Sequence, residues 1–421
     1  MNTVTLRSET RAQIEKINQT DIVVGIPSFN NAKTIAHVVR AVQAGLGKYF
    51  PSLRAVIINS DGGSKDGTKE IVESSTGPDF NSILLNHRVE PVSRIAFSYT
   101  GIPGKGSAFR SIFEIASSLT ARACVVVDAD LRSITPEWME MLIKPVLENG
   151  FDFVAPLYSR HKFDGTITNS IVYPLTRTLY GKRIRQPIGG DFGFSGKLAG
   201  FFLSKDVWDT EVARFGIDIW MTTTAIANSF KVAQSFLGAK IHDAKDPGLD
   251  LSDMLYQVVS ALFNLMENYS DTWLPLEGSQ AVPTFGFEYA VGLEHIPVTT
   301  SRMLENFRDG LFNLGDIWQT ILGPGDFGEI QRLGALKNED FVFGVNLWTR
   351  VIFDFAIAFH RRKLPAQQLI KSLTPLYLGK TASFINRARD MTAIEAEAEI
   401  EKLCMEFEQN KKYLVMHWEN K

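Results

Sequence analysis

Short, almost wholly apolar segments alternate with helical patterns over the first 157 residues, and this alternation restricts the fold more than any other feature. The apolar segments are 22–26, 55–58, 82–85, 123–127 and 153–157. Strands that lack polar alternation are buried on both faces, which requires helices on both sides of a parallel sheet. The helical patterns at 34–46 and 107–119 supply that cover. We therefore predict an α/β fold with a mostly parallel, Rossmann-like sheet.

The later part of the chain has a helical texture instead. Apolar residues recur at helical spacing in 253–269, 303–322 and 341–362. We predict one long amphipathic helix over 392–416 and a loop between helices over 323–340. The aromatic residues of this region are expected in helix cores, or in the interface of a homodimer: Trp318, Phe341, Phe343, Trp348 and Phe353. The expected domains are thus 1–250, a catalytic domain, and 251–421, a helical C-terminal region.

Composition excludes several classes of partner. A formal net charge of -3 predicts no affinity for nucleic acid or for anionic lipid surfaces. No apolar run reaches membrane-spanning length, and the N-terminus lacks the apolar core of a signal peptide. Only Cys124 and Cys404 are present, far apart in the sequence, so no disulfide framework is expected. These features favour a cytoplasmic protein.

Two carboxylates follow the fourth apolar segment in the stretch VVVDADLRSITPEWM. Asp128 and Asp130 stand where a buried strand would end, and close carboxylates without a counter-charge repel one another. Mg²⁺ and Mn²⁺ take oxygen ligands, commonly protein carboxylates together with substrate phosphates. The motif therefore favours a metal site, and the alternative is a helix cap beside a solvated turn residue.

Polar loops after the other strands suit a nucleotide. The loop PSFNNAKT follows the first strand, and Asp61 in NSDGGSKDGT follows the second and could accept a hydrogen bond from a base or ribose. The alternative for this second loop is a glycine-rich connection. Lys105 in GKG precedes a helix, where a cation and free N–H groups suit a phosphate. Ligands of such sheets bind at the carboxyl ends of the strands, so these loops should converge.

The chain resembles the GT-A glycosyltransferases in the order and spacing of four stretches: VVGIPSFNNAKTI, NSDGGSKDGT, GKG and VVVDADLRSITPEW. The stretches FVAPLYSRHKFDGTITNSIVYPLTRTLYG, QPIGGDFGFS, FGIDIW and GAKIHDAKDP narrow the resemblance. They are similar to the retaining transferases that glycosylate glycerate or 3-phosphoglycerate. These are mannosylglycerate synthase, glucosyl-3-phosphoglycerate synthase and glucosylglycerate synthase. The resemblance covers roughly residues 21–250.

The resemblance implies a role for individual residues. Asp128, Asp130 and His242 match the site of Mg²⁺ or Mn²⁺, with Asp130 the expected direct ligand. Asp191 and Asp218 match acidic residues near the reaction centre and are assigned to sugar or acceptor hydroxyls. The residues that match the nucleotide-sugar site are Pro27, Ser28, Asn31, Asp61, Lys105, Asp128, Ala129, Gly189 and Gly190. Asn31 departs from the pattern, since an acidic residue often occupies its position.

The expected acceptor site consists of Thr168, Thr166 and Arg160. The resemblance implies that Thr168 holds the glycerate carboxylate and that Thr166 stands where the phosphoglycerate-using enzymes have an arginine. A phosphate dianion would normally meet a cation there, so the threonine favours unphosphorylated D-glycerate. Arg160, His161 or Lys162 could substitute for the missing cation.

The sequence thus predicts a retaining transfer of glucose from a nucleoside diphosphate glucose to D-glycerate, yielding glucosylglycerate, a compatible solute. Transfer to 3-phosphoglycerate and transfer of mannose remain open, as does the donor base among ADP, GDP and UDP. More distant alternatives are a sugar-phosphate nucleotidyltransferase, an inverting polysaccharide-building transferase and a non-catalytic nucleotide-binding regulator.

Overall fold

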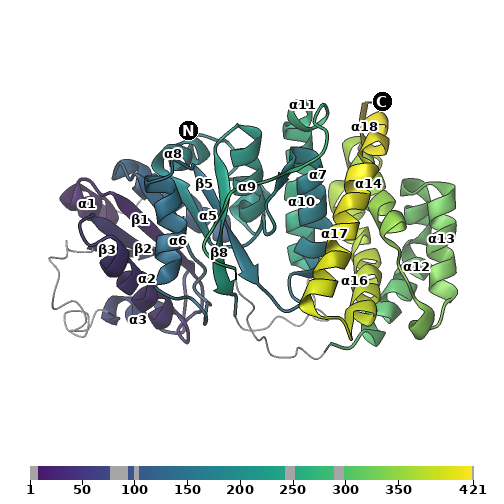
Figure 1. Ribbon diagram of the computed structural model, residues 1–421, viewed down its shortest axis with the longest axis horizontal. Helices are drawn as coiled ribbons and strands as arrows, with labels where there is room; N and C mark the ends of the chain where they lie inside the picture. The colour runs from purple at the N-terminus through teal and green to yellow at the C-terminus, as the bar shows by residue number, and fades with distance from the viewer. Residues whose placement is uncertain (1–7, 76–92, 99–103, 242–251, 289–297, 420–421) are drawn as a thin grey trace. The chain divides into compact units, whose positions relative to one another are not determined.

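The computed structural model describes residues 8–75, 93–98, 104–241, 252–288 and 298–419. The chain divides into two compact units (Figure 1). The sheet unit comprises Met1–Ser159, Ile188–Ala244 and Val282–Val291. The helical unit comprises Arg160–Pro187, Lys245–Ala281 and Gly292–Lys421.

The sheet unit is built on a twisted sheet whose described strands run in the order β10-β8-β5-β7-β4-β1-β2-β3. The strands are β1 Ile22–Ser28, β2 Ala55–Asp61, β3 Ser93–Ser98, β4 Ala123–Val126, β5 Phe153–Ser159, β7 Phe192–Ser195, β8 Val232–Ala239 and β10 Thr284–Phe285. All neighbouring strands pair in parallel except β7, which is antiparallel to both β4 and β5. The predicted mostly parallel sheet is confirmed. The strand expected at 82–85 lies outside the described residues.

Helices cover both faces of this sheet, as apolar strands require. The helices are α1 Ser8–Ile17, α2 Ile35–Tyr49, α3 Thr68–Ser74, α5 Lys105–Ser118, α6 Glu137–Leu147, α8 Gly196–Leu203, the short η2 Glu211–Ala213 and α9 Ile217–Ala227. Val24 faces the core shared with α2 and α6, whereas Gly25 faces α5. A Cβ added at Gly25 would lie 2.5 Å from Ile112 Cδ1, so the missing side chain lets α5 approach the strand closely.

The helical unit is a bundle with a small two-stranded pairing of β6 and β9. Its elements are η1 Thr168–Val172, α7 Tyr173–Tyr180, β6 Lys182–Arg183, α10 Ser252–Asn268, α11 Ser270–Trp273, β9 Gln280–Ala281, α12 Ser301–Ile321, α13 Pro324–Ala335, η3 Asn338–Asp340, α14 Val345–His360, α15 Ala366–Ser372, α16 Thr374–Ala388, α17 Ala393–Gln409 and α18 Lys411–Glu419. The aromatic residues expected in helix cores are all buried, including Trp318 and Trp348. None of the described helices is long and apolar enough to cross a bilayer.

The division between the units differs from the single boundary expected at residue 250. Residues 160–187 belong to the helical unit because their polar groups bond to its helices. Arg177 pairs with Glu401 at 2.6 Å and with Glu408 at 2.8 Å, both on α17. The Trp348 indole N–H donates to the Ser170 carbonyl at 2.7 Å. The segment 282–291 returns to the sheet unit, where β10 pairs with β8.

Two local predictions in the helical unit are wrong. The expected loop at 323–340 contains α13, which begins with Pro324 in its first turn and buries Ile330 and Leu333. The single helix expected over 392–416 is divided into α17 and α18 at Asn410. The Asn410 side-chain amide donates to the Glu406 carbonyl at 2.9 Å and competes with continuation of the helix.

Candidate active site

The carboxyl edge of the sheet gathers charged side chains from separate stretches of the chain. Asp128 follows β4, and Lys240 follows β8. Asp191 precedes β7, which begins at this same edge because it runs antiparallel to β4. Lys105 is the first residue of α5, and Asp218 lies in the first turn of α9. Strand direction therefore explains why residues so far apart in sequence meet here.

These five residues form a carboxylate–lysine cluster. The Lys105 ammonium lies 2.8 Å from Asp128 Oδ1 and 3.2 Å from Asp218 Oδ2. The Lys240 ammonium lies 2.8 Å from Asp128 Oδ2 and 2.7 Å from Asp191 Oδ2. Asp128 is thus held between two lysines, each of which also holds a second carboxylate.

Asp191 is the most buried member of the cluster, with no exposed surface. Its carboxylate accepts the Asp128 backbone N–H at 2.8 Å, the Lys240 ammonium and the Tyr158 hydroxyl. These bonds fix the backbone and the lysine that orient Asp128. The expected contact of Asp191 with a sugar or acceptor hydroxyl stays a prediction.

The carboxylates of the cluster differ in the direction of their pKa shifts. Burial opposes ionisation of Asp128, but Lys105 and Lys240 together hold its pKa well below the usual value. Burial raises the pKa of Asp191 and of Asp218 despite the nearby ammonium groups. Burial also opposes the charge on Lys105, but Asp128 and Asp218 raise its pKa, so this lysine stays charged.

Asp218 is placed to use an oxygen that the protein leaves available. Its carboxylate is buried in the first turn of α9, where the helix N-terminus favours a negative charge. Oδ2 pairs with Lys105, whereas Oδ1 has no hydrogen-bond partner among the described residues. A buried carboxylate oxygen without a partner is costly, and a ligand hydroxyl would satisfy it.

Gly189 and Gly190 lie against the cluster. The Gly189 carbonyl accepts a hydrogen bond from the Lys240 ammonium at 2.7 Å. Gly190 has a φ of 89°, and an added Cβ would lie 2.2 Å from Asp128 Oδ2 and 3.0 Å from the Lys240 ammonium nitrogen. Both the backbone conformation and the contact require glycine at position 190.

The turn after β2 is organised by Asp61. Its Oδ2 accepts the backbone N–H groups of Gly63 and Ser64, both at 2.8 Å. Its Oδ1 accepts the Ser64 hydroxyl at 2.6 Å and the Ser28 hydroxyl at 3.2 Å. Ser28 also accepts the Asn59 amide at 2.9 Å. This network holds both side chains in place, and the binding of the nucleotide by Asp61 and Ser28 stays a prediction.

The loop after β1 is bonded to the loop after β2. The Asn31 side chain accepts the Phe29 N–H at 2.8 Å, and the Asn31 N–H donates to the Thr68 hydroxyl at 2.8 Å. Asp66 accepts the Ala32 N–H at 2.9 Å. These hydrogen bonds hold the two loops together at the carboxyl edge of the sheet.

Two other predicted nucleotide-site residues lie at this edge in different settings. Pro27 is half-buried in β1, in register with Ser60 of β2. Ala129 is buried, and its carbonyl accepts the Thr34 hydroxyl at 2.7 Å. Ala129 thereby ties the loop after β4 to the start of α2.

The predicted acceptor residues lie in the helical unit. Thr166 is buried, and its hydroxyl bonds to the Tyr377 hydroxyl at 2.5 Å. Thr168 is also buried, and no described residue bonds to its hydroxyl. Arg160 pairs with Asp164 at 3.3 Å. Thr166 and Thr168 both lie in a helical segment that continues into the π-helix η1, so they are not related by the two-residue spacing of a strand.

Comparison with known proteins adds an independent line of evidence. Residues 23–207 match the family model described as Glycosyl transferase family 2. This segment is similar to the glycosyltransferases of that family. The match covers a little under half of the chain and includes Asp128, Asp130, Lys105 and Asp191. The similarity to glycosyltransferases predicted from the sequence motifs is confirmed for this segment.

Solved structures show a looser similarity. Glucosyl-3-phosphoglycerate synthase from Mycobacterium tuberculosis, in complex with phosphoglyceric acid, matches with 19% sequence identity and a TM-score of 0.45. The match covers 61% of this chain and 84% of that chain. The same enzyme with Mn²⁺, uridine-diphosphate-glucose and phosphoglyceric acid matches with 18% identity and a TM-score of 0.43, over 61% and 84% of the two chains. Among curated proteins, no match to the chain is found.

The sheet unit offers one carboxylate suited to a divalent cation. Asp130 is half-buried, and no hydrogen bond or ion pair joins its carboxylate to a described residue. Both oxygens of Asp128 already meet ammonium groups. No set of three or more metal-binding side chains occurs among the described residues. His242, the third expected ligand, lies outside them. Asp130 therefore fits a metal ligand better than Asp128 does.

Lys240 and Tyr158 are the site residues that sequence reasoning missed. Lys240 directly follows β8, and Tyr158 is the second-last residue of β5. The strand-end rule that selected Asp128 also applies to both positions. The apolar run before Lys240 indicates a strand that ends at this lysine, but the interpretation of this stretch rested on the nearby His242.

Proposed function

We propose that the chain transfers glucose from a nucleoside diphosphate glucose to D-glycerate, with retention of configuration at the sugar. The observation that carries this proposal is the carboxylate–lysine cluster at the carboxyl edge of the sheet. A diphosphate leaving group gains negative charge as the bond to the sugar breaks, and preorganised cations at that point stabilise the transition state. Lys105 supplies one such cation, held in place by Asp128 and Asp218.

The carboxylates of the cluster have separate proposed roles. Asp130 would hold Mg²⁺ or Mn²⁺, together with His242, and the bound cation would neutralise the leaving diphosphate. Asp128, held by two lysines, keeps the end of β4 in one conformation. The available Asp218 oxygen accepts a hydroxyl of the donor sugar or of the acceptor. The braced loops after β1 and β2 position the nucleoside.

Contacts within the helical unit support D-glycerate over 3-phosphoglycerate as the acceptor. Thr166 carries no charge, and its hydroxyl is engaged by Tyr377. Two cations that could replace the missing arginine are also engaged. Arg160 pairs with Asp164, and the Lys162 ammonium donates to two backbone carbonyls near the end of α16, at 2.7 and 2.6 Å. A phosphate dianion calls for a cation that is not already committed.

A donor-by-acceptor matrix tests the proposal. Purified full-length chain is incubated with ADP-, GDP- and UDP-glucose and with GDP-mannose, each with D-glycerate or 3-phosphoglycerate. Release of the nucleoside diphosphate is followed, and the anomeric configuration of the product is read by NMR. We expect an α-linked glucosylglycerate from an α-linked donor and a higher kcat/KM for D-glycerate. An inverted product, or a clear preference for 3-phosphoglycerate, would overturn the corresponding part of the proposal.

A further inference from the structure

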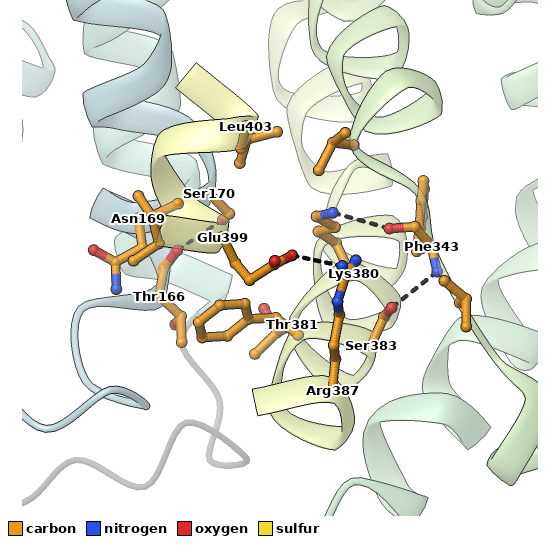
Figure 2. A pocket seen from close by; sticks show the side chains of 14 residues that line it. Thr166, Asn169, Ser170, Phe343, Lys380, Thr381, Ser383, Arg387, Glu399 and Leu403 are labelled. Carbon is orange, nitrogen blue, oxygen red and sulfur yellow. Dashed lines mark hydrogen bonds and ion pairs between the residues drawn. The ribbon is translucent and has the colours of Figure 1, made fainter. Parts of the chain in front are cut away.

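A small cavity lies within the helical unit, and Thr166 of the expected acceptor site is one of the residues that line it (Figure 2). Its volume is about 50 Å³, enough for a few water molecules or one small ligand. Residues of α16 and α17 line it together with the segment before α14 and the helical start of residues 166–170. Most of its wall is apolar, and a few polar side chains supply the rest, a composition that is common in ligand sites.

Lys380 of α16 extends along one wall of this cavity. The residue is 8% exposed, and its ammonium donates to the Phe343 carbonyl at 2.9 Å (Figure 2). A lysine ammonium has three protons to donate, and no other described residue accepts from this one. The neighbouring Thr381 is 2% exposed, and its hydroxyl interacts with the Tyr377 hydroxyl but forms no well-aligned hydrogen bond with a described residue. Two buried donor groups therefore lack sufficient acceptors.

The charged side chains that line the cavity carry more positive than negative charge. Glu399 of α17 is the carboxylate that lines it, and this side chain accepts Arg387 at 2.9 Å and Lys402 at 2.6 Å. Lys380 makes no ion pair with a described carboxylate. One carboxylate thus serves two cations, and the third cation is buried without a direct counter-ion. Burying an ammonium in this way is expensive unless an anion accompanies it.

We propose that this cavity binds a small monocarboxylate anion, of the size of formate or acetate, between Lys380 and Thr381. The anion's oxygens accept the remaining ammonium protons and the Thr381 hydroxyl. A volume of about 50 Å³ suits an anion of this size. The proposal does not rest on the proposed transferase reaction, although Thr166 of the expected acceptor site also lines the cavity. Occupation of the cavity joins α16 to the segment that precedes α14.

The pH dependence of binding follows from the groups that face Lys380. Burial, followed by the charge of Arg387, lowers the Lys380 pKa to about 7, and Glu399 opposes this shift. The other walls contribute no charged side chain among the described lining residues. An anion binds the protonated lysine, so affinity is highest below pH 7 and declines above it. From pH 6.5 to pH 8.5 the apparent affinity should decline about 20-fold, in proportion to the protonated fraction.

The test uses the full chain and sodium acetate as the probe. Acetate replaces chloride at constant ionic strength, and binding is followed by thermal unfolding and by the relaxation of ¹³C-labelled acetate. Wild type is compared with Lys380→Met, which keeps the apolar stem, and with Thr381→Val, which keeps the shape. Lys337→Met, at an exposed lysine of the same unit, is the matched control.

We expect saturable acetate binding by wild type and Lys337→Met, several-fold weaker binding by Thr381→Val, and none by Lys380→Met. If Lys380→Met does not fold, Thr381→Val and the comparison of pH 6.5 with pH 8.5 decide the question. The proposal is overturned if acetate stabilises wild type no more than chloride does. Equal binding at the two pH values, or by wild type and Thr381→Val, would also overturn it.

Discussion

Replacing Lys240 with methionine tests how the cluster is held together. The side chain of Lys240 is 4% exposed, and its ammonium contacts Asp128, Asp191 and the Gly189 carbonyl. Methionine keeps most of the stem but removes the charge. Asp128 retains Lys105, whereas Asp191 has no other cation within bonding distance among the described residues. Most of the loss of folding stability in this variant should therefore come from Asp191, whose buried carboxylate loses its counter-charge.

The magnitude follows from the protonation of that carboxyl. A buried carboxylate that loses its cation escapes the cost of charge by taking up a proton. Protonating an aspartate of ordinary pKa about 3.9 at pH 7 costs up to ~4 kcal/mol, at 1.36 kcal/mol per pH unit. Breaking a buried ion pair costs a similar amount, about 3–5 kcal/mol. We expect Lys240→Met to destabilise the sheet unit by up to about 4 kcal/mol at pH 7.

The same argument gives the sign of the pH dependence. In the variant, the folded-state pKa of Asp191 lies further above its unfolded value, because burial remains and the Lys240 charge is lost. The folded state then binds more protons than the unfolded state, so stability declines as pH rises through this window. The destabilisation should therefore shrink toward ~1.5 kcal/mol at pH 5, following the same 1.36 kcal/mol per pH unit.

Hydrogen exchange of the peptides that span β4 and β8 is the suitable assay, because a chain of two units need not unfold in one step. The double variant Asp191→Asn with Lys240→Met removes both charges and should recover most of the loss. Lys231→Met, at an exposed lysine just before β8, should change stability by less than about 0.5 kcal/mol. A Lys240→Met variant as stable as wild type at pH 7, or equally destabilised at pH 5 and 7, would refute the reasoning.

Three further substitutions have defined outcomes. Gly190→Ala should abolish transfer, because a Cβ would lie 2.2 Å from the Asp128 carboxylate, and near-normal steady-state activity would contradict the contact. Thr166→Val should lower the unfolding free energy of the helical unit by about 1–3 kcal/mol, since it strands the buried Tyr377 hydroxyl; an unchanged urea midpoint would argue against that bond. Thr392→Ala, which removes the capping box of α17, should cost about 1 kcal/mol without affecting kcat, and a loss of kcat would place the cap in the site.

The strands and most helices could be predicted because their apolar patterns are strong and local. The apolar runs at β1 and β4 are buried on both faces, so no tertiary information was needed to place them. The strand β7 was missed because Phe192–Ser195 follows two glycines and pairs only through distant partners on β4 and β5. The helix α13 was missed because its glycines disfavour a helix locally, whereas burial of Ile330 and Leu333 stabilises it.

The location of the candidate site could be predicted from the sequence, but the role of each residue could not. The strand-end rule predicts that Asp128 and Lys105 meet at one edge of the sheet, as they do, since it depends only on strand direction. Asp218, which pairs with the same lysine, was expected near them only from the family resemblance. The rule cannot tell a ligand-facing carboxylate from one engaged by the protein, as the internal bonds of Asp61 and Asp191 show. That distinction depends on hydrogen bonds across sequence separations that no local pattern records.

The most direct test of the account compares transfer by Asp130→Asn with transfer by wild type, at saturating Mn²⁺ and after treatment with EDTA. Asp209→Asn, an exposed aspartate of the same unit, is the matched control, and unchanged circular dichroism verifies the fold. We predict that wild type and the control release nucleoside diphosphate only with the cation present, and that Asp130→Asn is reduced at least about 100-fold, as expected for loss of a stabilising contact to the leaving group. Near-normal activity of Asp130→Asn, or wild-type transfer that EDTA does not affect, would contradict a metal-assisted reaction at this edge of the sheet.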